Sequence, residues 1–150
     1  MPHVVANHIL IPEIASLLRE GKRVLFTPTG SSMRPFIEGG RDTVILELLP
    51  AVHKGDICLV QLPGGDESSH YVLHRVIQVE NGQVTLQGDG NLRGIEHCRI
   101  ADVLGTVVRI QTPWGRTKPL TNGLLWRTLF RPRWFWLKVY RHTIVKYAYN

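Results

Sequence analysis

Short β-rich runs separated by turn-forming residues fill the middle of the chain, and they constrain its fold more than any other feature. The runs cover residues 23–26, 43–48, 57–61, 71–79, 83–87 and 103–110. Asn81-Gly82 between two of the runs is typical of a two-residue hairpin turn, and residues 64–69 are typical of an exposed hairpin loop. Strands joined by such short turns pair antiparallel. The sequence therefore predicts a mainly β, antiparallel fold.

Helical patterns flank this β-rich middle. Pro12 at a first helical position, Ile14, Leu17 and Leu18 on one face and Gly21 as a stop predict a short N-terminal helix. A second helical pattern starts at Leu124, is interrupted by Pro132 and resumes over residues 134–149. A chain of 150 residues is of a size for one core. We expect one domain over residues 1–122 and a basic, aromatic helical tail over residues 123–150.

A serine turn follows the first predicted strand. Gly30 permits a sharp change of backbone direction before Ser31 and Ser32, which would lift the Ser32 hydroxyl out of the sheet. The backbone N–H of Ser32 is our first candidate for an oxyanion donor, and the Ser31 hydroxyl is a second. Serines in such turns also serve as simple hydrogen-bond fillers.

A serine nucleophile needs a base, and His74 in an apolar strand is the candidate. Strand residues alternate between faces, so we expect His74 to reach the site while Arg75 points to the other side. The base acts in its neutral form, so activity should fall as the pH drops through the imidazole pKa, ordinarily about 6.5. The alternative is a hydrogen-bonded structural histidine.

Asp89, in the glycine-bracketed turn Gly88-Asp89-Gly90-Asn91, is the candidate for the acid that orients His74. Aspartate in such a turn also commonly bonds its own backbone. Glu96 is the nearest alternative carboxylate.

These residues occur in the order found in a known superfamily. The matching segments are Ser32-Met33-x-Pro35, Gly40-x-Asp42, Lys54-Gly55-Asp56, His74-Arg75-Val76-Ile77, Gly88-Asp89-x-Asn91 and Val103-Leu104-Gly105. Together they resemble the serine peptidases that include type I signal peptidases and self-cleaving repressors. Within that superfamily the chain is similar to the histidine-type branch of archaea and the endoplasmic reticulum, because a histidine stands where bacterial enzymes carry lysine.

The resemblance implies a serine endopeptidase that cuts an extended segment of a precursor peptide or protein. It implies catalytic roles for Ser32, His74 and Asp89, supporting roles for Met33, Pro35, Arg75, Gly88 and Asn91, structural turns at Asp42 and Asp56, and no cofactor. A catalytically silent peptide-binding module is the alternative. A repressor-type, DNA-associated protein is less favoured, because neither Ala-Gly nor Cys-Gly occurs and only about 20 residues precede the first predicted strand.

The net charge of +6 lies entirely in the last third of the chain. Residues 1–102 contain all 12 acidic residues and nine basic ones, whereas residues 103–150 contain nine basic residues and no acidic one. Trp134, Trp136, Lys138 and Arg141 mix aromatic and basic side chains, a combination that suits a membrane surface. It also suits packing back onto the domain. Nucleic acid is the less favoured partner.

No apolar run of roughly 18 residues and no signal-peptide pattern is present, so we expect a cytoplasmic protein whose membrane contact is peripheral. Cys58 and Cys98 are expected to be reduced, partly buried thiols. His70 and His74 have a zinc-like spacing, but they lie in a predicted strand without a glutamate between them, so no metal site is predicted.

Overall fold

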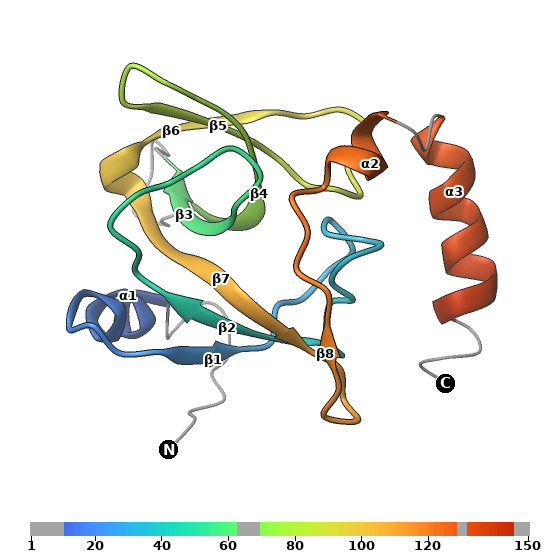
Figure 1. Cartoon of the computed structure of the whole chain (residues 1–150), viewed down its shortest axis with the longest axis horizontal. Coiled ribbons are helices and arrows are strands. Elements are labelled where there is room, and N and C mark those ends of the chain that lie inside the picture. The colour runs from blue at the N-terminus through green and yellow to red at the C-terminus, as the bar shows by residue number, and fades with distance from the viewer. Residues whose placement is uncertain (1–10, 63–69, 129–131, 146–150) are drawn as a thin grey trace.

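The architecture comes from a computed structural model, which describes residues 11–62, 70–128 and 132–145. Its centre is one antiparallel sheet of eight strands, seven of them in the order β1-β2-β7-β3-β4-β5-β6, with β8 paired to β7 outside this path. The sheet curves around a filled interior, with α1 at one end and the C-terminal helices at the other (Figure 1). The strands are β1 (Val24–Phe26), β2 (Thr43–Glu47), β3 (Ile57–Leu62), β4 (His70–Glu80), β5 (Gln83–Gln87), β6 (Glu96–Arg99), β7 (Val103–Gln111) and β8 (Thr117–Lys118).

The predicted mainly β, antiparallel class and all six predicted strands are confirmed, as is the N-terminal helix α1 (Ile11–Arg19). Strands β6 and β8 were not predicted. β6 reads Glu-His-Cys-Arg, and only Cys98 of the four side chains is buried. An edge strand with one core residue carries too little apolar alternation to be visible in the sequence. The predicted loop at 64–69 lies outside the described residues.

The turn between β4 and β5 has the backbone that its sequence predicts. Asn81 has φ 51° and Gly82 has φ 76°, and both positions of a type I′ turn require positive φ. The flanking residues Glu80 and Gln83 pair directly across the hairpin. This turn fixes the register of β5, and therefore the position of the segment that follows it.

Buried apolar side chains of the strands and of α1 form two clusters. The larger joins one face of α1, through Ile14 and Leu18, to residues of β1, β2, β3 and β7. Leu18 lies so close to β7 that a Cβ on Gly105 would come within 2.8 Å of its Cδ1. The smaller cluster contains Cys58 and Cys98, which are buried and unpaired as predicted. Burial raises the pKa of the Cys58 thiol to about 12 and that of Cys98 to about 11.

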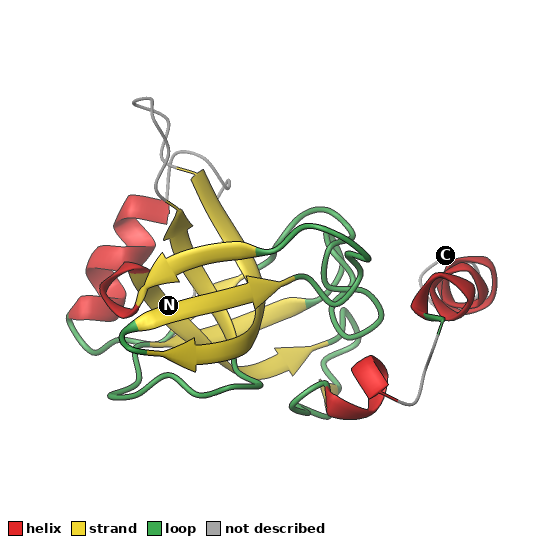
Figure 2. Ribbon diagram, turned by 90° about the horizontal axis from the view of Figure 1, so that it is seen from above, coloured by secondary structure: helices red, strands yellow, loops and turns green. Residues whose placement is uncertain are grey.

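The C-terminal segment forms α2 (Leu124–Thr128), α3 (Arg133–Tyr140) and one π-helical stretch (Arg141–Val145). Both α-helices lie beyond the loops at one end of the sheet (Figure 2). The tail predicted from residue 123 is attached to the domain at its start, because Trp126 of α2 is only 5% exposed. Within the described part of the chain, no helix combines the length and hydropathy needed to span a bilayer.

Candidate functional site

A cavity of about 530 Å³ is lined by both Ser32 and His74. The rest of the lining is mainly apolar and comes from α1, β1, the turn after β1, β3 and β4. Among the described residues, the lining includes no carboxylate, lysine or arginine. The main apolar side chains are Ile11, Phe26, Met33, Ile37, Leu59 and Leu73.

The Ser32 turn starts directly after β1 and is built as the sequence predicted. Gly30 has φ 85°, a conformation that a residue with a Cβ rarely adopts. The Arg34 backbone N–H then donates to the Ser31 carbonyl at 3.2 Å. Met33 is 5% exposed and anchors the turn in the larger apolar cluster, while the Arg34–Pro35 peptide bond is cis. Ser31 is exposed and Ser32 is half-buried.

The turn at residues 88–91 holds the Ser32 turn from the other side. The Gly90 N–H donates to the Ser32 carbonyl at 2.8 Å. A Cβ on Gly88 would lie 2.4 Å from that carbonyl oxygen and 2.7 Å from Nδ2 of Asn91, which leaves no room for a side chain. The supporting roles predicted for Gly88 and Asn91 therefore have a physical basis: they let the two turns pack backbone to backbone.

His74 lies on β4 opposite Cys58 of β3, and it is 6% exposed. Its Nδ1 is 2.6 Å from Oε1 of Glu96 on β6, a close contact whose angle departs from that of an aligned hydrogen bond. Burial lowers the pKa of His74 below its ordinary value of 6.5, and the Glu96 carboxylate acts in the opposite direction. Since burial has the larger effect, the imidazole is neutral at physiological pH.

The carboxylate in direct contact with His74 belongs to Glu96, the alternative that the sequence analysis named beside Asp89. Both oxygens of Asp89 are occupied by arginines: Oδ2 accepts from Arg75 Nη2 at 2.7 Å, and Oδ1 accepts from Arg127 Nη2 at 3.1 Å. The Asp89 side chain is completely buried. Two guanidinium groups offset the cost of burying this charge and hold the carboxylate in place.

Arg75 points away from His74, as strand alternation predicts, and it connects several loops. Its Nη1 donates to the Gly55 carbonyl at 2.8 Å and also to the Thr121 carbonyl. Its guanidinium lies 5.1 Å from the centroid of the Phe36 ring. The side chain is 1% exposed. Arg75 therefore supports the Ser32 turn through Asp89 and Phe36.

Two residues of α2 complete this framework, and the sequence analysis assigned no role to either. Trp126 Nε1 donates to the Asp89 carbonyl at 2.7 Å, and the Trp126 ring meets Phe36 edge-on at 6.4 Å. Arg127 donates to the Gln87 carbonyl at 3.1 Å as well as to Asp89. The available signal was a basic residue in a segment without acids.

Asp42 and Asp56 have the turn roles that were expected of them. Asp42 Oδ2 accepts from the Glu38 N–H at 2.8 Å and pairs with Lys118 Nζ at 2.6 Å. Asp56 Oδ2 accepts from the His53 N–H at 2.8 Å. In the described part of the chain, no group of three or more His, Cys, Asp or Glu side chains could hold a metal ion.

Comparison with known proteins assigns no family: neither the models of known protein families nor the curated protein sequences give a match to this chain.

Proposed function

We propose that the protein is a serine endopeptidase of the signal-peptidase-like type, with Ser32 as nucleophile, His74 as base and Glu96 as the residue that orients the base. The observation that carries the proposal is the shared cavity: Ser32 and His74, 42 positions apart in the sequence, line one apolar hollow. The ordered motifs from Ser32 to Gly105 support the same assignment. The proposal differs from the sequence-based one in the acid alone.

The contact with Glu96 selects the tautomer of His74 that catalysis needs. We place the proton on Nδ1, the nitrogen 2.6 Å from Oε1 of Glu96, which leaves the lone pair on Nε2. Nε2 can then accept the proton of the Ser32 hydroxyl as Oγ attacks the carbonyl carbon of the scissile bond. The backbone N–H of Ser32 is the nearest candidate to stabilise the resulting oxyanion.

The reaction then proceeds by acyl transfer. When the tetrahedral intermediate collapses, the C–N bond breaks and His74 gives its proton to the leaving amine. A water molecule, activated by the same imidazole, attacks the acyl carbon and releases the carboxylic acid and the Ser32 hydroxyl. Each proton taken by His74 is returned, so the chemistry needs no cofactor.

The shape and chemistry of the cavity favour an extended substrate with uncharged side chains near the scissile bond. The lining residues that the structure describes carry no carboxylate, lysine or arginine, so a charged side chain entering there would be desolvated without a partner among them. β1 is an end strand of the sheet and runs directly into the Ser32 turn. A peptide added beside it would gain backbone hydrogen bonds and place alternate side chains in the cavity.

The test combines a serine-directed covalent probe with a peptide library in which one position varies. The native chain is expected to be labelled at Ser32 and to cleave peptides with small or apolar residues before the cut. Ser32→Ala should abolish both, and His74→Gln should lower both by about 10²-fold or more, whereas Ser31→Ala is the matched control in the same turn. Equal labelling of native protein and Ser32→Ala would remove the nucleophile assignment. Peptide binding without labelling or cleavage would instead assign the silent binding module.

A further inference from the structure

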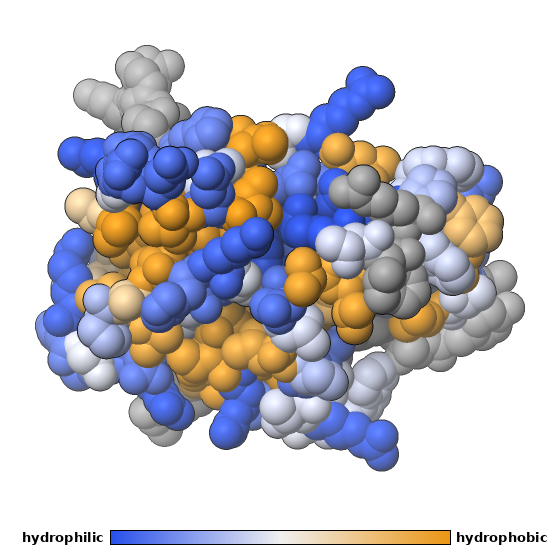
Figure 3. Space-filling view, turned by 45° about the horizontal axis from the view of Figure 1, so that its top comes forward, coloured by the Kyte–Doolittle hydropathy of each residue, from blue (hydrophilic) through white to orange (hydrophobic). Residues whose placement is uncertain are grey.

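The outer face of α3 carries exposed aromatic and aliphatic side chains. Trp134 is 57% exposed, Phe135 45% and Val139 37%. Their basic neighbours Lys138 and Arg141 are exposed as well. The C-terminal end of the molecule accordingly mixes hydrophobic and hydrophilic surface (Figure 3).

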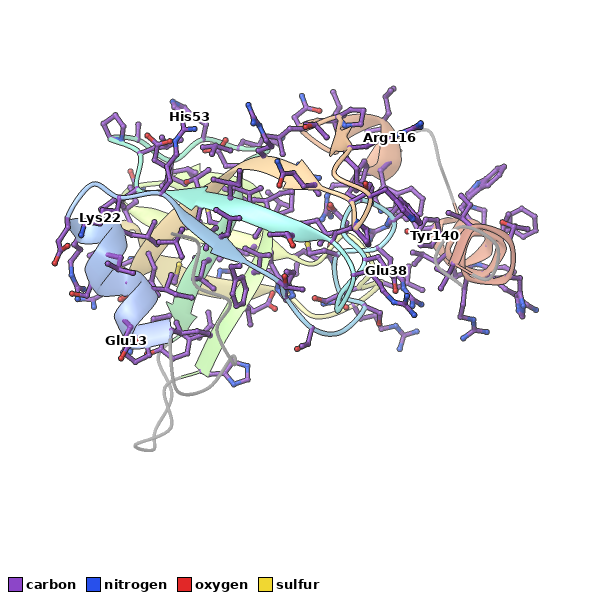
Figure 4. The ribbon with its side chains drawn as sticks, turned by 90° about the horizontal axis from the view of Figure 1, so that it is seen from below. Glu13, Lys22, Glu38, His53, Arg116 and Tyr140 are labelled. Atoms are coloured by element: carbon purple, nitrogen blue, oxygen red, sulfur yellow. The ribbon has the colours of Figure 1, made fainter. Side chains whose placement is uncertain are left out.

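The opposite face of α3 is more deeply buried. Tyr140 is 7% exposed, and Arg133 and Leu137 are half-buried. These residues are three or four positions apart, so they share one face of the helix. Tyr140 lies on the side of α3 toward Glu38 (Figure 4). The helix therefore buries one face, and Trp134 and Phe135 lie outside that buried face.

The charge around this face has one sign. No acidic residue occurs from position 103 to 150, where nine basic residues lie. Glu38, which lies near Tyr140 in Figure 4, is 5% exposed and pairs with Arg34 at 2.7 Å. An anionic partner would thus meet lysine and arginine without meeting a free carboxylate on α3.

We propose that the outer face of α3 binds the surface of an anionic lipid bilayer, with Trp134 and Phe135 in the headgroup region and with Lys138 and Arg141 on the lipid phosphates. Aromatic rings and aliphatic stems bury their apolar parts at such a surface while cationic groups stay hydrated. A nucleic acid would satisfy the two cations but would leave Val139 and the aromatic faces largely exposed to water. This inference stands independently of the peptidase proposal.

The test is co-sedimentation of the full chain with vesicles of phosphatidylcholine alone and of phosphatidylcholine mixed with phosphatidylserine. The native chain should pellet with the anionic vesicles, and added salt should release it. The double variants Trp134→Ala/Phe135→Ala and Lys138→Glu/Arg141→Glu should each lower the vesicle-bound fraction by about tenfold or more. Labelling of Ser32 should be unchanged in both, which separates a failure of this inference from a failure of the proposed function.

The β7–β8 turn offers matched controls far along the chain from α3. Trp114 there is 60% exposed, and Arg109 and Arg116 are exposed on the same hairpin. Trp114→Ala and Arg109→Glu/Arg116→Glu should leave vesicle binding within about twofold of native. Equal loss in these controls, or no loss in the α3 variants, would overturn the proposal. Binding to random-sequence duplex DNA but not to vesicles, lost in the α3 charge variant, would also overturn it and reassign the surface.

Discussion

Asp89 and Glu96 lie seven positions apart, and they differ in burial and in the partners of their carboxylates. Asp89 is fully buried and is paired to two arginines through both oxygens. Glu96 is 20% exposed in its side chain, contacts His74 through Oε1, and has no hydrogen-bond partner for its buried Oε2. The Asp89 carboxylate thus pairs with two arginines, and the Glu96 carboxylate contacts an imidazole.

The difference shows what each carboxylate can do. The Asp89 carboxylate joins β4, the turn at 88–91 and α2 into one unit, and that turn in turn holds the Ser32 carbonyl. A carboxylate held by two guanidinium groups has no free lone pair directed at a catalytic base. Glu96 contacts His74, so we expect its charge to stabilise a proton that the ring gains. The following predictions test this division, beginning with the largest effect.

Asp89→Asn should lower the free energy of unfolding by about 3–5 kcal/mol, because it leaves two partly or fully buried guanidinium groups without their carboxylate. Urea unfolding followed by circular dichroism measures the change. The control is Glu96→Gln, which should cost less than about 1 kcal/mol because its group is partly hydrated. If both variants lost equal stability, the division between the two carboxylates would be wrong.

Arg127→Ala should lower the free energy of unfolding by about 1–3 kcal/mol, because the charged hydrogen bonds to Asp89 and Gln87 are lost at once. Arg127→Lys should recover part of the loss, since one ammonium cannot reproduce a planar fork of donors. Arg116→Ala on the exposed β7–β8 turn is the control and should stay within about 0.5 kcal/mol of native. An effect no larger than that of Arg116→Ala would show that α2 is only loosely attached.

The sequence predicted those parts of the molecule that depend on local patterns. β-branched alternation identified six strands, Asn81-Gly82 identified a hairpin, and the Gly30-Ser31-Ser32 turn fell where expected. Which carboxylate meets His74 depends on the register of β6 against β5, where Leu86 pairs with Glu96. That register is a long-range property of a polar edge strand, and single-sequence patterns do not determine it.

The contacts of α2 with Asp89 could not be predicted from the sequence for the same reason. Trp126 and Arg127 lie about forty positions after Asp89, with β6, β7 and β8 between them. Composition showed that the last third of the chain is basic, but it could not show that Arg127 is paired inside the domain while Lys138 and Arg141 are exposed. Net charge describes what a surface attracts, and it does not distinguish buried cations from free ones.

Glu96→Gln should lower kcat by about tenfold with little change in KM, because the variant loses the charge that stabilises the imidazolium while the cavity is unchanged. Steady-state cleavage of the best library peptide measures this. Glu80→Gln, an exposed carboxylate at the end of β4, is the matched control and should have native rates. A native kcat in Glu96→Gln would return the orienting role to another group or to none.

The smallest effect concerns pH, and its sign follows from the two opposing influences on His74. Burial lowers the pKa of His74 below 6.5, and the Glu96 and Asp89 carboxylates act in the opposite direction. In the native chain kcat/KM should therefore fall only when the pH drops below 6.5, since the base must be neutral. The same depressed pKa favours folding above pH 6.5, and this contribution should be lost as the pH falls toward the folded-state value. In Glu96→Gln burial acts without the Glu96 charge, the larger of the opposing influences, so the acid limb of the kcat/KM profile should move to lower pH. A limb that moved to higher pH would mean that Glu96 does not face the imidazole in solution, and the comparison between the two carboxylates would then rest on Asp89 alone.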